Sequence, residues 1–397
     1  MARPSRLIGR VQGGRPGPTL VAIGGIHGNE PSGVVALQRV VAELAPRAAE
    51  VAGEVIALKG NLAALAAGRR YMARDLNRLW LAERIEEIVA RAARGLDARP
   101  EDHEQAELYR ELLAAFEGAR GRTYVLDLHS TSGAGAPFVV LCDTLPNRAF
   151  ARRLPVPVVV GLEEQLEGTL LSFLSDLGHI TIAFESGQHD APTSVENAEA
   201  AVWIALETAG LIDGKKLGAP GRVLATLKAS GAGLPRVAEV RYRHAIKPED
   251  RFHMDPGYTN FKPVEKGQPL ARDQRGAVRS PETGRILMPL YQPLGDDGFF
   301  LVRGFNPFWL KLSAVLRRLQ ADSIVHWLPG VTRHPERQAT YRVNRKIARW
   351  YALEIFHLLG FRRTSPETGQ DAKFLLVARR PHDVEVDHQA SWVTRRR

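Results

Sequence analysis

Two short segments of this 397-residue chain carry side chains that could together hold a metal ion. The first contains His27 and Glu30 within the run Gly-Gly-Ile-His-Gly-Asn-Glu, and the second ends in Asp127-Leu-His129. Each segment follows an apolar run typical of a buried strand, and α/β proteins place their chemistry where such strands end. Two imidazoles and one carboxylate form a ligand set for a catalytic zinc that keeps a fourth position for water. The pattern therefore predicts a hydrolase-type metal site.

The local sequence around His27 favours a tight turn from a strand into a helix. Glycines on both sides of this histidine allow the backbone to approach an ion closely. Pro31 disfavours the helical region for Glu30 and suits the first position of a helix over Ser32 to Leu44. A His-x-x-Glu pair alone is common by chance. The pair becomes a specific signal because a strand and glycines surround it and because a second strand ends in His129.

Length and composition indicate a large soluble protein of two or three units. The chain has 44% hydrophobic residues, which is enough for a sizeable core. No apolar stretch near the N-terminus resembles a signal peptide, and no run is long enough to span a membrane. Cys142 is the only cysteine, which excludes a disulfide framework. We expect a cytoplasmic protein.

Residues 1–215 are expected to form an α/β catalytic domain, because short apolar runs alternate with longer amphipathic stretches. Arg94 to His103, with its Gly, Pro and mixed charges, is expected to be a loop. The expected strands are Leu20–Ile23, Glu54–Leu58, Tyr124–Leu128, Phe138–Leu141 and Thr181–Phe184. The expected helices are Ser32–Leu44, Arg78–Ala93, Glu104–Phe116, Thr169–Leu177 and Val195–Ala209.

The pattern changes after about residue 215. Residues 216–305 hold short β-rich runs separated by Gly, Pro and Asp clusters, which predicts a small all-β domain. Its expected strands include Glu239–Tyr242, Phe261–Pro263 and Phe299–Val302. Residues 306–397 are expected to be a mainly helical extension. Its expected elements are the helices Leu310–Leu319 and Tyr341–Leu359 and the strand Phe374–Val377.

The extension carries nearly all of the net charge of +10. Residues 306–397 hold 17 Lys or Arg against 8 Asp or Glu, whereas the other 305 residues hold 37 against 36. A basic helix with interleaved aromatic residues can bind anionic lipid or nucleic acid. It can equally pack on its own catalytic domain or on a second subunit of a homo-oligomer. We favour packing, because an apolar stripe recurs every three or four residues along Tyr341–Leu359.

Four motifs in order along the chain resemble the aspartoacylase and succinylglutamate desuccinylase family, within the zinc carboxypeptidase-like superfamily. The resemblance extends from about residue 19 to about 303 and includes a run typical of the family's C-terminal β domain. It implies a three-layer α/β domain with a central mixed sheet. The motifs are Gly-x-His27-Gly-x-Glu30, Arg70-Tyr71 with Asp75-Leu-Asn77-Arg78, Asp127-Leu-His129 and Phe184-Glu185-x-Gly187.

The resemblance implies one zinc ion per chain, held by His27, Glu30 and His129. It implies that Glu185 is the general base for a metal-activated water that attacks an amide carbonyl. In the same comparison Arg70 matches the residue that polarises the scissile carbonyl.

Asn77 and Arg78 match residues that bind a substrate carboxylate, a task suited to the rigid fork of a guanidinium. Two positions depart from the family pattern: Ser175 stands where aspartoacylases have a further arginine, and Phe299-Phe300 stand where a tyrosine is expected.

The sequence therefore predicts a zinc-dependent hydrolase that cleaves the amide bond of an N-acyl amino acid. One alternative is a metallocarboxypeptidase or amidase that acts on larger peptide-like substrates with the same metal and base. Another is a scaffold or binding protein that acts through its basic extension and an anionic partner.

Overall fold

The computed structural model describes most of the chain. The described residues are 5–94, 99–214, 220–321, 325, 327–335, 340–344, 347, 352–363, 374–380 and 382–384. Within this part of the chain, no helix is both long and apolar enough to cross a membrane.

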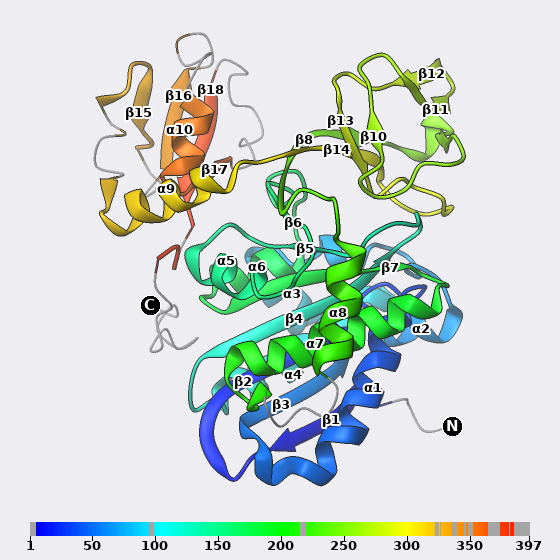
Figure 1. Ribbon diagram of the computed structural model, residues 1–397, viewed down its shortest axis with the longest axis vertical. Coiled ribbons are helices and arrows are strands. Elements are labelled where there is room, and N and C mark those ends of the chain that lie inside the picture. The colour runs from blue at the N-terminus through cyan, green and yellow to red at the C-terminus, as the bar shows by residue number, and fades with distance from the viewer. Residues whose placement is uncertain are drawn as a thin grey trace.

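A mixed eleven-stranded sheet runs through most of the molecule (Figure 1). This confirms the expected α/β fold with a large central mixed sheet. The strands in spatial order are β1 (Leu7–Gln12), β3 (Ala52–Lys59), β2 (Arg15–Gly24), β4 (Thr123–Thr131), β7 (Ile180–Gln188), β5 (Phe138–Val140), β6 (Val158–Val160), β8 (Val237–Ala245), β14 (Asp297–Gly304), β13 (Gly284–Leu287) and β10 (Pro263–Val264).

Helices cover both faces of the catalytic part of this sheet, which gives three layers. Along β2, Leu20 and Ala22 pack in the core on one face of the sheet, while Val21 and Ile23 pack in the core on the other face. Such burial on both faces explains why the central parallel strands are continuous apolar runs. The α-helices of this part are α1 (Ser32–Leu44), α2 (Leu62–Ala67), α3 (Ala82–Ala93), α4 (Pro100–Glu117), α5 (Leu145–Ala151), α6 (Leu170–Asp176), α7 (Pro192–Ala209) and α8 (Pro220–Ser230), with the 3₁₀ turns η1 (Ala45–Glu50) and η2 (Leu76–Arg78).

Two expected boundaries near residue 90 are wrong. The expected loop over 94–103 is helical from Pro100, because proline at the first turn and the Asp102 carboxylate, which accepts from the Arg99 N–H, begin α4 earlier. Residues 95–98 lie outside the described residues. The expected helix from Arg78 begins only at Ala82, since Leu76–Arg78 form η2 and residues 79–81 are not helical.

The β-rich region is joined to the catalytic domain through the main sheet. Strand β6 pairs in parallel with β8, and β8, β14, β13 and β10 then pair antiparallel. A separate three-stranded sheet is formed by β9 (His253–Met254), β11 (Pro269–Asp273) and β12 (Gly276–Arg279), and η4 (Pro248–Asp250) precedes it. The hydrogen-bonded junction fixes the β-rich region next to the catalytic strands.

The extension is not mainly helical, so that expectation is wrong for the described residues. The described residues of the extension form a four-stranded antiparallel sheet and two helices (Figure 1). The expected helix Tyr341–Leu359 is a strand at its start, since Tyr341 and Val343 are both buried with period 2 and pair with the strand Phe374–Arg379. Residues 345–346 and 348–351 of that range lie outside the described residues. The elements are α9 (Pro307–Arg318), β15 (Val331–Arg333), β16 (Thr340–Asn344), α10 (Ala352–Leu358), β17 (Phe361–Arg363) and β18 (Phe374–Arg379).

The extension packs on the catalytic domain through buried charges. Arg317 of α9 is fully buried and donates to the Asp143 carboxylate at 2.9 Å and to Asp383 at 2.8 Å. Asp143 precedes α5 and also pairs with Arg148 and with Arg362 of β17. Several of the extension's cations therefore serve internal contacts, in line with the expected packing on its own catalytic domain.

Candidate metal centre and active site

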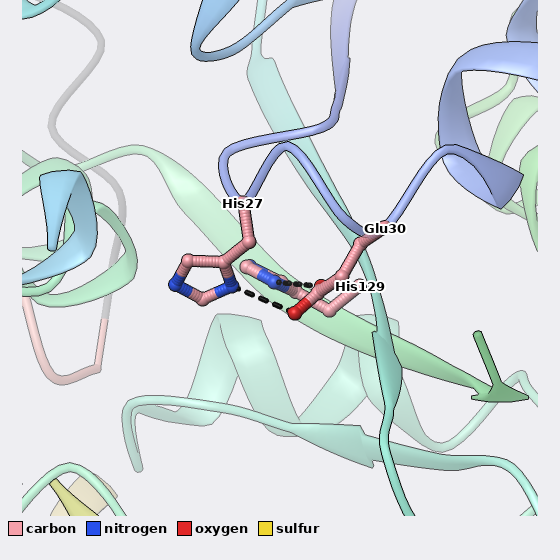
Figure 2. Close-up of side chains that lie close together, drawn as sticks. All are labelled: His27, Glu30 and His129. Carbon is pink, nitrogen blue, oxygen red and sulfur yellow. Dashed lines mark hydrogen bonds and ion pairs between the residues drawn. The ribbon is translucent and has the colours of Figure 1, made fainter. Parts of the chain in front are cut away.

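Three side chains converge at the ends of β2 and β4 (Figure 2). His27 Nδ1 lies 2.8 Å from Glu30 Oε1, and His129 Nδ1 lies 3.1 Å from Glu30 Oε2. One ligand atom from each residue can be chosen so that all lie within 4.8 Å of one another. The three side chains are almost completely buried. The sequence-predicted ligands are thus brought together in one place.

Two further carboxylates hold the histidine rings. Asp75 Oδ1 lies 3.1 Å from His27 Nε2, and Asp127 Oδ2 lies 2.9 Å from His129 Nε2. Both rings therefore turn Nδ1 toward Glu30 and Nε2 toward an outer carboxylate. This is the arrangement in which metal-binding histidines are ordinarily oriented and made more basic. These donors and their orientation fit a divalent cation, which His27, Glu30 and His129 would hold.

The loop that carries His27 and Glu30 is fixed by close backbone packing. A Cβ atom on Gly28 would lie 2.0 Å from the carbonyl carbon of Ala64, so glycine is required there. The Gly28 N–H donates to the Arg70 carbonyl at 3.2 Å, and the Glu30 N–H donates to the His27 carbonyl at 3.2 Å. These contacts explain the glycine-rich sequence and set the two ligands at the edge of the sheet.

Glu30 is held in its charged form. Burial alone would raise its pKa, but the imidazoles of His27 and His129 hold the pKa of Glu30 well below its usual range. The Ser130 N–H also donates to Glu30 Oε2 at 3.1 Å. A carboxylate that stays ionised can bind a cation without first losing a proton.

Glu185 lies on β7 beside the ligands. It is paired in register with His129 of the parallel neighbour β4. Burial raises the pKa of Glu185 to about 8, and its Oε2 atom has no hydrogen-bond partner among the described residues. A bound cation nearby would oppose this rise. The position and the unpartnered oxygen suit a carboxylate that exchanges a proton with a ligand.

The two predicted arginines line the same cavity, but Asn77 is not among its lining residues. Arg70 donates to Asp75 at 3.0 Å and to Glu30 at 3.5 Å, while its Nε–H has no partner in the described part of the chain. Asn77 Oδ1 accepts from the Leu170 N–H at 2.9 Å. The side-chain carbonyl of Asn77 therefore accepts a hydrogen bond from the first residue of α6.

A series of hydrogen-bonded polar side chains, which the sequence did not predict, crosses the cavity. Ser130 Oγ lies 2.8 Å from His189 Nδ1, and His189 Nε2 lies 3.0 Å from Gln292 Oε1, which also accepts from Asn29 at 2.7 Å. His189, in the turn after β7, lines the cavity. The only sequence signal for His189 was its position after a strand. Gln292 belongs to the β-rich region, which is distant from His189 in the sequence.

The two departures from the family pattern lie in different surroundings. Ser175 is buried in α6, where its Oγ accepts from Asn147 Nδ2 at 3.1 Å, and it does not line the cavity. Phe299 packs in the core of the β-rich region. Phe300 does line the cavity, so an apolar ring stands there.

Residues 16–205 match the family model of the succinylglutamate desuccinylase/aspartoacylase catalytic domain. This stretch contains all seven sequence-predicted site residues. This match confirms the resemblance to the succinylglutamate desuccinylase/aspartoacylase family that the motifs indicate.

Solved structures show the same fold at low sequence identity. A succinylglutamate desuccinylase/aspartoacylase from Rhodobacter sphaeroides is 18% identical with a TM-score of 0.55, over 75% of this chain and 88% of that one. The ectoine utilization protein EutE from Ruegeria pomeroyi is 21% identical with a TM-score of 0.51, over 74% and 86%. An aspartoacylase family protein from Mesorhizobium loti is 18% identical with a TM-score of 0.51, over 74% and 87%. No curated protein matches the chain.

Proposed function

We propose that the protein is a zinc-dependent hydrolase that cleaves the amide bond of an N-acyl amino acid. The observation that carries the proposal is the convergence of His27, Glu30 and His129 with the buried carboxyl of Glu185 in one cavity. The match of residues 16–205 to the family's catalytic domain supports the same reaction class.

The donor set fits zinc better than a harder cation. Two imidazole nitrogens and one carboxylate form a typical catalytic zinc set, whereas Mg²⁺ and Ca²⁺ prefer oxygen ligands throughout. His27, Glu30 and His129 would hold one ion per chain. Once bound, zinc would supply a water of lowered pKa and a Lewis acid for the amide carbonyl.

The remaining residues supply proton transfer and charge stabilisation. Glu185 accepts a proton at its free Oε2 and returns it to the leaving amine nitrogen. Arg70 offers its unpartnered Nε–H to the oxygen that becomes negative during attack. Arg78 offers a guanidinium to the substrate carboxylate. Each role follows from a group that lines the cavity.

The size of the cavity favours a small substrate over a peptide. Its volume is about 70 Å³, and residues of the β-rich region, among them Met288, Leu290 and Gln292, form part of its wall. The Tyr291 N–H donates to Ser132 Oγ at 3.0 Å, which ties this segment to the catalytic domain. The alternative of a metallocarboxypeptidase or amidase that acts on larger peptide-like substrates thus receives less support.

The decisive test is Glu185→Gln, which keeps the shape of the side chain and removes the base. We expect turnover of a panel of N-acyl amino acids to fall by ~10²–10⁴ while about one zinc per chain is retained. Zinc content by atomic emission and initial rates of amine release are the measurements. Undiminished turnover, or a wild-type protein that cannot be loaded with zinc, would refute the proposal.

A further inference from the structure

Arg78, the expected anchor for a substrate carboxylate, is itself paired with a carboxylate in the cavity. Its terminal Nη2 donates to Asp297 Oδ2 at 3.3 Å, and its Nη1 donates to the Asn77 carbonyl at 3.0 Å. Both side chains are largely buried, with 22% of Arg78 and 13% of Asp297 exposed. Arg78 comes from the catalytic domain, whereas Asp297 begins β14 of the β-rich region.

Asp297 is in turn fixed by a second guanidinium. Arg243 of β8 donates through Nε to Asp297 Oδ1, and its Nη1 donates to the Gln165 carbonyl. Arg243 does not line the cavity. Asp297 therefore bridges Arg243, which lies outside the cavity lining, and Arg78, which lines the cavity. It holds the guanidinium of Arg78 in one position.

The charges around the cavity limit how many substrate carboxylates it can accept. Its arginines are Arg70 and Arg78, whereas four carboxyl side chains line it. Those four are Glu30, Glu185, Asp296 and Asp297. The lining thus holds twice as many carboxyl groups as guanidinium groups, so a second substrate carboxylate would meet mainly like charge.

Arg70 cannot serve a second carboxylate freely, because its terminal nitrogens already pair with Glu30 and Asp75. The rest of the wall near the arginines includes apolar side chains, and Ser175 lies elsewhere. These apolar residues are Leu166, Met288, Leu290 and Phe300. Further cations, Lys247 and Arg251, line only an adjoining outer groove that shares Asp296 with the cavity.

We propose that the site accepts an N-acyl amino acid with a single carboxylate and an uncharged side chain, and that Asp297 sets this preference. The inference rests on the proposed function and adds the substrate class to it. Asp297 holds Arg78 for the one carboxylate and, with Asp296, repels a second. An acidic side chain in the inner cavity meets two carboxylates and no free guanidinium.

N-acetylglutamine and N-acetylglutamate provide the sharpest test, because they have nearly the same shape and differ in one charge. With zinc-loaded wild-type protein we expect kcat/KM to be at least about tenfold higher for N-acetylglutamine, since like charges at close range disfavour the acid. Equal rates, or a preference for N-acetylglutamate, would overturn the proposal.

Three variants test whether Asp297 sets the preference for the uncharged side chain. Asp297→Asn should reduce the ratio of the two kcat/KM values by about fivefold or more and raise KM for N-acetylglutamine, because Arg78 loses its partner. Asp296→Asn, at an exposed position, should reduce the ratio in the same direction and guards against misfolding of the first variant. Glu265→Gln removes an exposed charge of the β-rich region that does not line the cavity, and should leave the ratio unchanged.

Binding of the free amino acids separates this inference from the proposed function. Calorimetry with zinc-loaded protein should give tighter binding of glutamine than of glutamate, and Asp297→Asn should narrow the difference. If no N-acyl amino acid is hydrolysed but glutamine still binds selectively, the proposed reaction fails and the charge preference stands. Equal or tighter binding of glutamate overturns the preference whatever the rates.

Discussion

At the scale of residues, the meeting of the three candidate ligands could be predicted because their types and positions are local properties. His27 and Glu30 follow the apolar strand β2, His129 lies near the end of β4, and parallel strands bring their carboxyl ends to one edge. The surroundings of these ligands could not be predicted in the same way. Gln292 and Asp297 reach the cavity from the β-rich region, and no local pattern marks them.

Arg70→Ala tests the charge-stabilising role assigned to Arg70. We expect kcat to fall by ~10²–10³, because a buried donor to the developing negative charge is lost. Arg69→Ala is the matched control, since Arg69 is exposed and absent from the cavity lining. Zinc content must be measured for both, because Arg70 also contacts Glu30. A kcat unchanged in zinc-loaded Arg70→Ala would contradict the role.

At the scale of elements, the catalytic strands and helices were predicted better than the extension. Helix α1 has the predicted bounds of Ser32–Leu44, because a proline and an amphipathic pattern mark it locally. The start of the range Tyr341–Leu359 was predicted wrongly, since apolar residues there fit both a helical and a strand period. The pairing of β16 with β18 shows that the strand period is the correct one. The division at residues 215 and 305 stays a prediction.

Gly28→Ala tests the strand-to-helix turn that carries two of the ligands. We expect zinc affinity to fall at least about tenfold, because the new methyl group displaces the loop from Ala64 and shifts His27 and Glu30. Gly14→Ala is the control, since a Cβ there meets no atom within 4 Å. Competition with a chelating dye measures the affinity. Equal zinc affinity in the two variants would contradict this account of the turn.

At the scale of the whole molecule, buried charges connect the extension to the catalytic domain. Arg317 also donates to the carbonyls of Asp143 and His357, so its guanidinium joins both parts of the chain. Such a network specifies one docked arrangement only while every partner is present. The same groups make the extension's position sensitive to substitution and to pH.

Arg317→Met should destabilise the protein by about 3–5 kcal/mol, because it leaves Asp143 and Asp383 with fewer cationic partners in a buried place. Arg318→Met should change stability by less than about 0.5 kcal/mol, since Arg318 is exposed. Urea unfolding followed by fluorescence gives both values. Equal midpoints for the two variants would show that the buried network does not hold the extension.

The His357 contact makes docking of the extension depend on pH. Burial opposes protonation of His357, but Glu164 at 3.2 Å and Glu239 at 3.8 Å outweigh it and raise the pKa of His357 to about 9. The folded-state pKa lies above the ordinary value of about 6.5. The stabilisation is therefore complete below about pH 6.5 and is lost as pH rises through 9.

Burial, together with the nearby Glu164, raises the pKa of Glu163 to about 7. Because this folded-state pKa lies above the ordinary value, Glu163 also makes the protein less stable as the pH rises from about 4.5 to 7. The contribution of His357 is isolated by comparison with His357→Gln, which cannot be protonated. We expect the wild-type Tm to exceed that of the variant at pH 6 and the difference to shrink toward zero by pH 10. A difference that stays constant over this range would mean that the charge of His357 does not hold the extension in place.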